Sequence, residues 1–112
     1  MKIFNKTKPV FQEVRFLNAF GLMFRSKPKK NEAIILKLEK QSKFFSAIHM
    51  LFVFYPIYVI WLNKKNIVVD IKRCYPFQPF SMPKSPASLI IECTKLPSIK
   101  INDKLTIDSK TI

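Results

Sequence analysis

Glycine is almost absent from this chain: Gly21 is the only one in 112 residues. Loops that hold a phosphate with backbone N–H groups need several glycines, so nucleotide-binding loops of that kind are excluded. Hairpins that turn through Asn-Gly or Gly-X pairs are excluded for the same reason. We therefore expect Asn, Asp, Lys and Pro to form the turns.

Histidine and cysteine are also scarce, which limits metal chemistry. His49 is the single histidine, and Cys74 and Cys93 are the only cysteines. These residues match no zinc-binding pattern, so we expect neither a metal nor another cofactor. Both cysteines lie beside strand-like sequence and are predicted to be buried free thiols, although the sequence leaves a single disulfide open.

The first residues of the chain favour an intracellular protein. Residues 1–6 lack the continuous apolar stretch of a signal peptide. Reduced thiols fit the same compartment. We therefore predict a cytoplasmic location.

Acidic residues are few: 7 Asp and Glu stand against 20 Lys and Arg, which gives a net charge of +13. Such an excess would attract nucleic acid or another polyanion. A/T-rich coding is an alternative explanation, because Lys, Ile, Asn and Phe are common and the basic residues are spread along the chain. The densest cluster, Lys27, Lys29 and Lys30, is either a nucleic-acid contact or a solvated loop.

Hydrophobic residues are plentiful, at 48% of the chain, and 11 of them are Phe. A chain of this length forms one domain. We predict that domain over residues 1–108, with residues 109–112 as a frayed tail.

One apolar run needs separate treatment, because residues 44–62 carry no charge and have the length of a membrane-spanning helix. Pro56 lies within it and would break a helix, and Tyr55 before it is pushed toward extended geometry. Two buried strands that meet at this point explain the same residues, so a membrane is not an expected partner.

Period-two alternation of apolar and polar residues predicts strands along most of the chain. Turns are expected at 63–66 and at 102–103, and a long loop at the proline-rich residues 75–86. A short helix is predicted at 16–24. These elements predict a mainly β fold: a small antiparallel β-sandwich or flattened barrel with one short helix. The predicted strands cover residues 10–15, 33–39, 57–62, 67–72, 88–93 and 104–108.

Five fragments, in this order, resemble the family called domain of unknown function 192, an uncharacterised ancient conserved region. Gly21–Arg25 is similar to its Gly-Leu-Met-x-Arg segment, and Ile48–Asn63 to its Ile-His-Thr-x-x-Met-x-x-x-Ile-Asp-Val-x-Phe-Leu-Asp motif. Tyr75–Phe77 stands where the family has Lys-Pro-Trp. Leu89–Glu92 resembles a Val-Leu-Glu-Leu strand, and Ile99–Leu105 resembles the closing Ile-x-x-Gly-Asp-x-Val.

The resemblance implies a mainly β sandwich and brings no established activity with it. The chain departs from the long motif at four positions, three of which are polar in the family: Met50 replaces Thr, Tyr58 replaces Asp and Asn63 replaces the final Asp, while Val53 replaces the apolar Met. These replacements preserve the strand pattern but remove the groups that a shared chemical site would need.

Three residues form the predicted ligand pocket: His49, Arg25 and Glu92. A histidine titrates near neutral pH and can serve as acid, base or ligand, but no acidic partner is evident, so no catalytic residue is assigned. A core or pocket-wall histidine with one nitrogen bonded to backbone is the simpler explanation of His49. Arg25 could bind an anion or form a surface ion pair. Glu92 could approach His49, but alternation on its strand predicts the solvent face.

Two aromatic residues, Phe77 and Phe80, lie in the proline-rich loop and could stack on nucleic-acid bases or pin the loop to the core. Our leading hypothesis is a binding or structural module with a pocket near His49. The second is an RNA- or DNA-binding protein that uses lysines and these rings. An enzyme built on a single histidine is third, because its supporting acids are missing.

Overall fold

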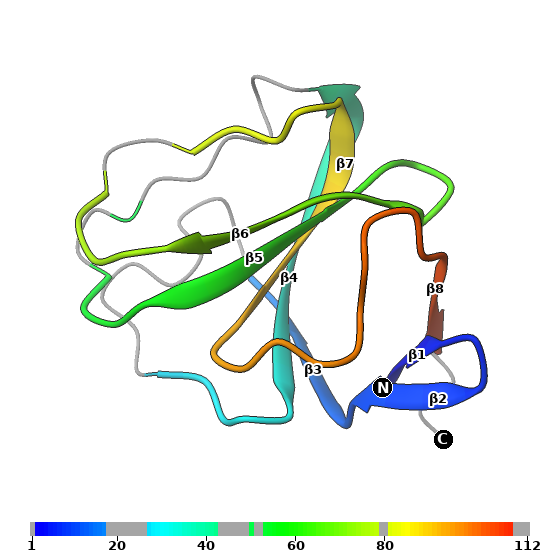
Figure 1. Ribbon diagram of the computed structural model, residues 1–112, viewed down its shortest axis with the longest axis horizontal. Coiled ribbons are helices and arrows are strands. Elements are labelled where there is room, and N and C mark those ends of the chain that lie inside the picture. The colour runs from blue at the N-terminus through cyan, green and yellow to red at the C-terminus, as the bar shows by residue number, and fades with distance from the viewer. Residues whose placement is uncertain (1, 18–26, 43–49, 51–52, 79–80, 109–112) are drawn as a thin grey trace.

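The computed structural model describes residues 2–17, 27–42, 50, 53–78 and 81–108, and the structural statements below concern these residues. They form two β-sheets (Figure 1). The strands are β1 (Lys2–Asn5), β2 (Lys8–Phe11), β3 (Glu13–Phe16), β4 (Glu32–Ser42), β5 (Ile57–Leu62), β6 (Val68–Cys74), β7 (Ala87–Cys93) and β8 (Leu105–Asp108).

The larger sheet has the strand order β3-β4-β7-β5-β6, and the smaller one β2-β1-β8. The smaller sheet closes one face of the larger one, where Ile3, Phe11 and Leu105 pack with residues such as Ile60 and Ile91. Burial of this apolar surface is the main force that holds the two sheets together.

The other face of the larger sheet is also buried, but residues outside the strands cover it. Met50 and Val53 pack there against Val59, Trp61 and Ile90. Trp61 is completely buried. The central strand β7 is therefore covered on both faces, and the run from Leu89 to Cys93 reads as almost continuously apolar for that reason.

The predicted mainly β fold is confirmed, and the sandwich alternative is the better description because the two sheets do not close into a barrel. The sheet is not wholly antiparallel, since β3 pairs with β4 in parallel. The strand predicted at 10–15 is two strands separated at Gln12, and β1 was not predicted. Most of the predicted helix, and the tail at 109–112, lie outside the described residues; Phe16 ends β3.

The two predicted turns are confirmed, and asparagine makes both of them. Asn66 has a φ of 63° and Asn102 a φ of 80°, the left-handed region that Asn tolerates. The side chain of Asn63 accepts hydrogen bonds from the backbone N–H groups of Lys65 and Ile67. Asparagine thus replaces the missing glycines at both places.

Within the ranges that the structure covers, no helix has the length and apolar character needed to span a bilayer. The second half of the charge-free run forms β5, and the residues between Val53 and Pro56 lead into it without regular structure. The rest of the run, residues 44–49 and 51–52, lies outside the described residues.

Candidate functional site

Three of the predicted site residues, His49, Arg25 and Phe80, lie outside the described residues. Glu92 is described, and the expected solvent-face position is wrong: its exposed fraction is only 3%. It pairs with Ile34 of β4 and Val59 of β5 and lies on the face covered by Met50 and Val53. A carboxyl group is therefore buried in the second core.

Burial raises the pKa of Glu92 from 4.5 to about 7. Its Oε1 atom is buried and has no hydrogen-bond partner within the part of the chain that is described. Nearby, burial and then the charge of Glu92 raise the pKa of Tyr55 to about 12, although Arg15 acts in the opposite direction. Among the described residues, no three His, Cys, Asp or Glu side chains gather as metal ligands would.

The prediction of buried free thiols is confirmed, because Cys74 and Cys93 are both buried and unpaired with each other. Burial, followed by the charge of Glu92, raises the pKa of Cys93 to about 12. Burial also raises the pKa of Cys74, while a hydrogen bond with Ser81 lowers it in part. The reactive thiolate is therefore disfavoured at both positions.

We expect both thiols to resist iodoacetamide at pH 8 in the folded protein and to react fully in denaturant. Intact-mass spectrometry after a short incubation would show no added mass without denaturant and two added groups with it. Rapid labelling of the folded protein at either position would contradict the burial of that thiol.

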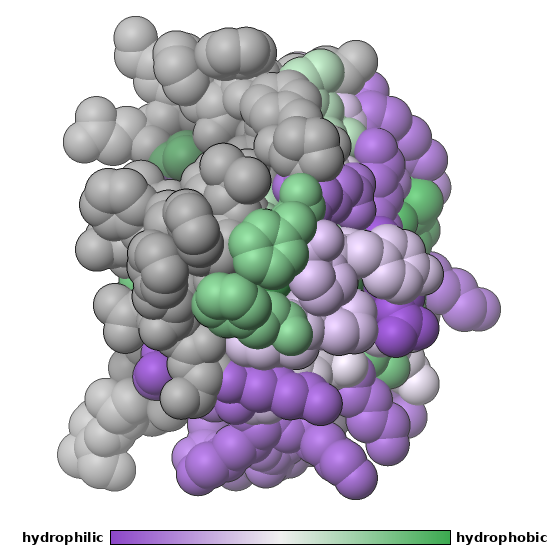
Figure 2. Space-filling view, turned by 90° about the vertical axis from the view of Figure 1, so that its left-hand side faces the viewer, coloured by the Kyte–Doolittle hydropathy of each residue, from purple (hydrophilic) through white to green (hydrophobic). Residues whose placement is uncertain are grey.

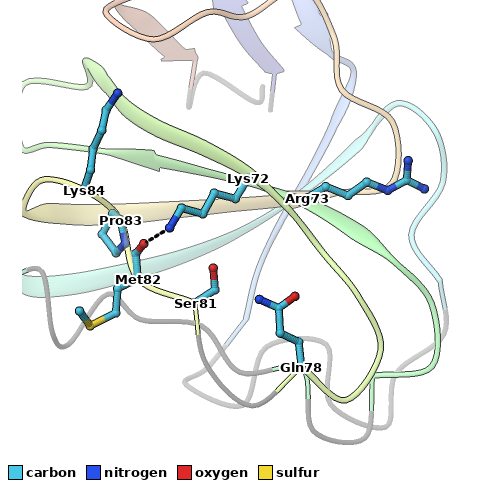
Figure 3. A pocket seen from close by; sticks show the side chains of 7 residues that line it. All are labelled: Lys72, Arg73, Gln78, Ser81, Met82, Pro83 and Lys84. Atoms are coloured by element: carbon cyan, nitrogen blue, oxygen red, sulfur yellow. Dashed lines mark hydrogen bonds between the residues drawn. The ribbon is translucent and has the colours of Figure 1, made fainter.

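An open pocket of about 740 Å³ lies beside the edge strand β6 (Figure 3). On one side is Lys72, whose Nζ donates a hydrogen bond of 2.6 Å to the carbonyl oxygen of Met82. The side chains of Gln78 and Ser81 rise from the loop on the opposite side, while Arg73 points away from Lys72. The described lining residues are Lys72, Arg73, Gln78, Ser81, Met82, Pro83 and Lys84, of which three are cationic and none is acidic.

Asp70 fixes the loop that forms the pocket wall. Its side chain is only 8% exposed, and its Oδ2 accepts a hydrogen bond of 2.9 Å from the backbone N–H of Lys84. Its Oδ1 accepts another from the N–H of Ile71, and Lys72 Nζ lies 4.0 Å from Oδ2. Asp70 therefore holds β6 and residues 82–84 together, and it offsets part of the charge of Lys72.

The same loop is attached to the residue that follows His49. The backbone N–H of Met50 donates to the carbonyl of Gln78 at 2.8 Å, and the N–H of Phe77 donates to the carbonyl of Met50 at 2.9 Å. Gln78 also lines the pocket. The pocket thus lies close in structure to the residue next to His49.

A second feature begins on the other side of β6, where aromatic rings surround an arginine. The guanidinium carbon of Arg73 lies 5.3 Å from the Tyr58 ring centre and 5.6 Å from that of Tyr75. Phe54 and Phe77 meet edge to face with ring centres 5.4 Å apart. We call Phe54, Tyr58, Arg73, Tyr75 and Phe77 the aromatic end; three of its four rings are exposed.

The predicted lysine cluster reaches the same end of the molecule. Lys27, Lys29 and Lys30 are exposed, and the carbonyl of Pro28 among them accepts a hydrogen bond from Thr94. Thr94 follows Cys93, which pairs with Tyr58. Figure 2 views this end and shows a small hydrophobic patch beside grey atoms, with hydrophilic side chains below it and to its right.

The structure therefore brings Phe77 and the three lysines to one end, whereas Glu92 lies in the core. Sequence reasoning missed Lys72, Arg73, Tyr75 and Lys84. A signal was present, because adjacent Lys72 and Arg73 end a strand and Tyr75 follows directly. Two successive strand residues point to opposite faces of a sheet, so the alternation predicts that Lys72 and Arg73 lie on two different surfaces.

Fold and site together define a small two-sheet β-domain with a basic pocket and an aromatic end. The model of the family domain of unknown function 192, described as an uncharacterized ACR, matches residues 12–105. The chain belongs to this family, as the resemblance of its motifs implied.

Similar proteins agree with this assignment. A UPF0127 protein of Pyrococcus furiosus is 36% identical over 109 residues, which cover 89% of this chain and 90% of that protein. A UPF0127 protein of Thermococcus sibiricus is 35% identical over 95 residues, 80% of this chain and 61% of the other. A crystal structure of a protein of unknown function from Novosphingobium aromaticivorans has a TM-score of 0.78 at 18% identity, over 95% of this chain and 82% of that one.

Proposed function

We propose that this protein is a binding module and that its ligand is an anion held in the pocket beside β6. The observation that carries this proposal is the charge of the described lining, which includes Lys72, Arg73 and Lys84 and no carboxylate. The net charge of +13 adds a long-range field that draws an anion toward the molecule.

The polar groups of the pocket suit recognition. The ammonium of Lys72 lies 6.0 Å from the centre of the buried Trp61 ring, which helps to fix its position. The amide of Gln78 and the ammonium groups of Lys72 and Lys84 can all donate hydrogen bonds to phosphate-type oxygens. Asp70 lies behind this wall, where it bonds the loop backbone. His49 stays a proposed contributor, through its neighbour Met50, and Arg25 stays a proposed member of a wider pocket, whereas Glu92 is buried in the core and is not among the pocket's lining residues.

We expect pyrophosphate, as a simple probe, to bind the wild-type protein at low salt and the Lys72→Gln/Lys84→Gln variant at least about tenfold more weakly. Isothermal titration calorimetry gives the affinities, and backbone amide shifts near Gln78 and Lys84 would locate the ligand.

The matched control is Lys65→Gln/Lys104→Gln, which removes the same charge from two exposed positions near the β5–β6 turn: Lys65 lies in that turn, and Lys104 pairs with Ile67 beside it. Equal weakening in both double variants would mean that net charge alone attracts the anion, and the pocket proposal would then be wrong. Circular dichroism would check that each variant is folded.

We also propose a cytoplasmic location, supported by the two free, buried thiols. Fractionation of the native host with a tagged full-length chain tests this; recovery from an oxidising compartment would overturn it.

A further inference from the structure

We infer that the anion is the backbone of a single-stranded nucleic acid whose bases stack on Tyr75 and Phe77. This inference rests on the proposed anion pocket and names the class of its ligand. Single-strand binding proteins combine cations that follow the phosphates with exposed rings on which bases stack. Both elements occur here at the end of β6 and in the loop that follows it.

The rings and the pocket share a single turn. Tyr75 and Phe77 are 55% and 48% exposed, and Gln78, which closes the turn, also lines the pocket. The N–H of Gln78 donates to the carbonyl of Tyr75, and the Gln78 side chain accepts from the N–H of Tyr75, both at 3.1 Å. A nucleotide stacked on either ring would therefore lie next to Gln78, one of the residues that line the pocket.

Phe77 has an unusual backbone for an exposed ring. Its φ is 62°, a left-handed conformation that is unfavourable for a bulky side chain. The hydrogen bond from its N–H to Met50 and its contact with Phe54 hold it there. Strain of this kind persists where the surrounding structure enforces it, often at binding sites.

Arg73 orients the other ring and adds charge. Its guanidinium lies against the faces of both Tyr58 and Tyr75, so it covers one face of Tyr75, while the residue as a whole stays 55% exposed. The N–H groups at the edge of a stacked guanidinium can still donate to a phosphate.

The lysine loop extends the basic path beyond the rings. Lys27 and Lys30 are exposed at this end, while Lys29 lies 3.7 Å from the carboxylate of Glu13 and is partly neutralised. Cations on both sides of the rings suit a polymer with a charge at every unit. A compact anion such as pyrophosphate could fill only the pocket.

The test is fluorescence anisotropy with a labelled, unstructured oligouridine of about 15 nucleotides, a length within the range that single-strand binding domains occupy. The variant is Tyr75→Ala/Phe77→Asn, because Asn tolerates the left-handed turn. We expect it to bind at least about tenfold more weakly than the wild type. The control Phe16→Ala, which removes a ring with similar exposure from the opposite edge strand β3, should bind normally.

Competition by unlabelled polyanions separates the two proposals. We expect single-stranded RNA to compete better, per phosphate, than inorganic polyphosphate or an RNA duplex, whose bases are stacked internally. Equal competition by polyphosphate, with the ring variant behaving like wild type, would overturn the nucleic-acid inference and leave the anion pocket intact. No binding of RNA, polyphosphate or pyrophosphate at low salt would overturn both.

Discussion

Replacement of Glu92 by Gln is expected to raise the free energy of unfolding by about 3 kcal/mol at pH 8. The reason is the buried carboxyl on β7, whose pKa rises from 4.5 to about 7 because water is excluded from it. Each pKa unit corresponds to ~1.4 kcal/mol, so a difference of about 2.5 units gives the expected size. Gln keeps the shape of the side chain and cannot ionise.

The direction of the pH dependence follows from proton binding. Between pH 4.5 and about 7 the folded protein keeps the proton on Glu92 and the unfolded chain has lost it. The stability of the wild-type protein therefore falls as the pH rises through this window. Above pH 7 both states are ionised and the loss is complete, and below pH 4.5 both are protonated and the variant gains nothing.

Urea unfolding from pH 4 to pH 8 would measure this difference, with Glu13→Gln as the control. Glu13 is a half-exposed carboxylate on the edge strand β3, so its removal changes the net charge equally without altering the core. If the unfolding free energies of Glu92→Gln and the wild type changed in parallel at all pH values, Glu92 would not be the group that makes the stability depend on pH.

The sequence predicted much of the fold because local chemistry decides those parts. The apolar run after Pro56 predicted a buried strand at 57–62 that matches β5 at both ends, and the Asn-rich turns appear where left-handed residues were needed. The parallel pairing of β3 with β4 could not be predicted, because it depends on the path of a long connection. β1 is too short to show alternation, and its partners β2 and β8 lie at opposite ends of the described chain.

The site was harder to predict, because an interpretation based on period-two alternation assumes that one face of the sheet is exposed to solvent. Both faces of β7 are buried, so the face that carries Glu92 also carries the buried Ile90 and is not exposed to solvent. Ile90 was the available clue, since an apolar residue on the supposed solvent face argues for burial. The basic pocket depends on Lys72 and Lys84, which are twelve residues apart and line the same pocket only because the loop folds back on β6. No local sequence pattern encodes such an arrangement.

The second large effect is expected at Asp70, which stabilises the fold and also holds the loop that forms the wall of the proposed binding pocket. We expect Asp70→Ala to lower the free energy of unfolding by about 3 kcal/mol, because a buried carboxylate that bonds two backbone N–H groups is removed. We also expect pyrophosphate to bind at least about tenfold more weakly. The loop that carries Lys84 loses one of its attachments to β6, while the hydrogen bond from Lys72 to the carbonyl of Met82 remains.

Charge alone predicts the opposite for binding, which makes the measurement decisive. Removal of a carboxylate 4.0 Å from Lys72 Nζ raises the local positive potential and would strengthen anion binding if the pocket kept its shape. Asp70→Asn keeps a single acceptor oxygen and should give intermediate stability. Urea unfolding and calorimetry on both variants test the two effects together. Unchanged stability in Asp70→Ala would refute the structural role, and stronger pyrophosphate binding would show that the pocket does not depend on the loop that Asp70 holds.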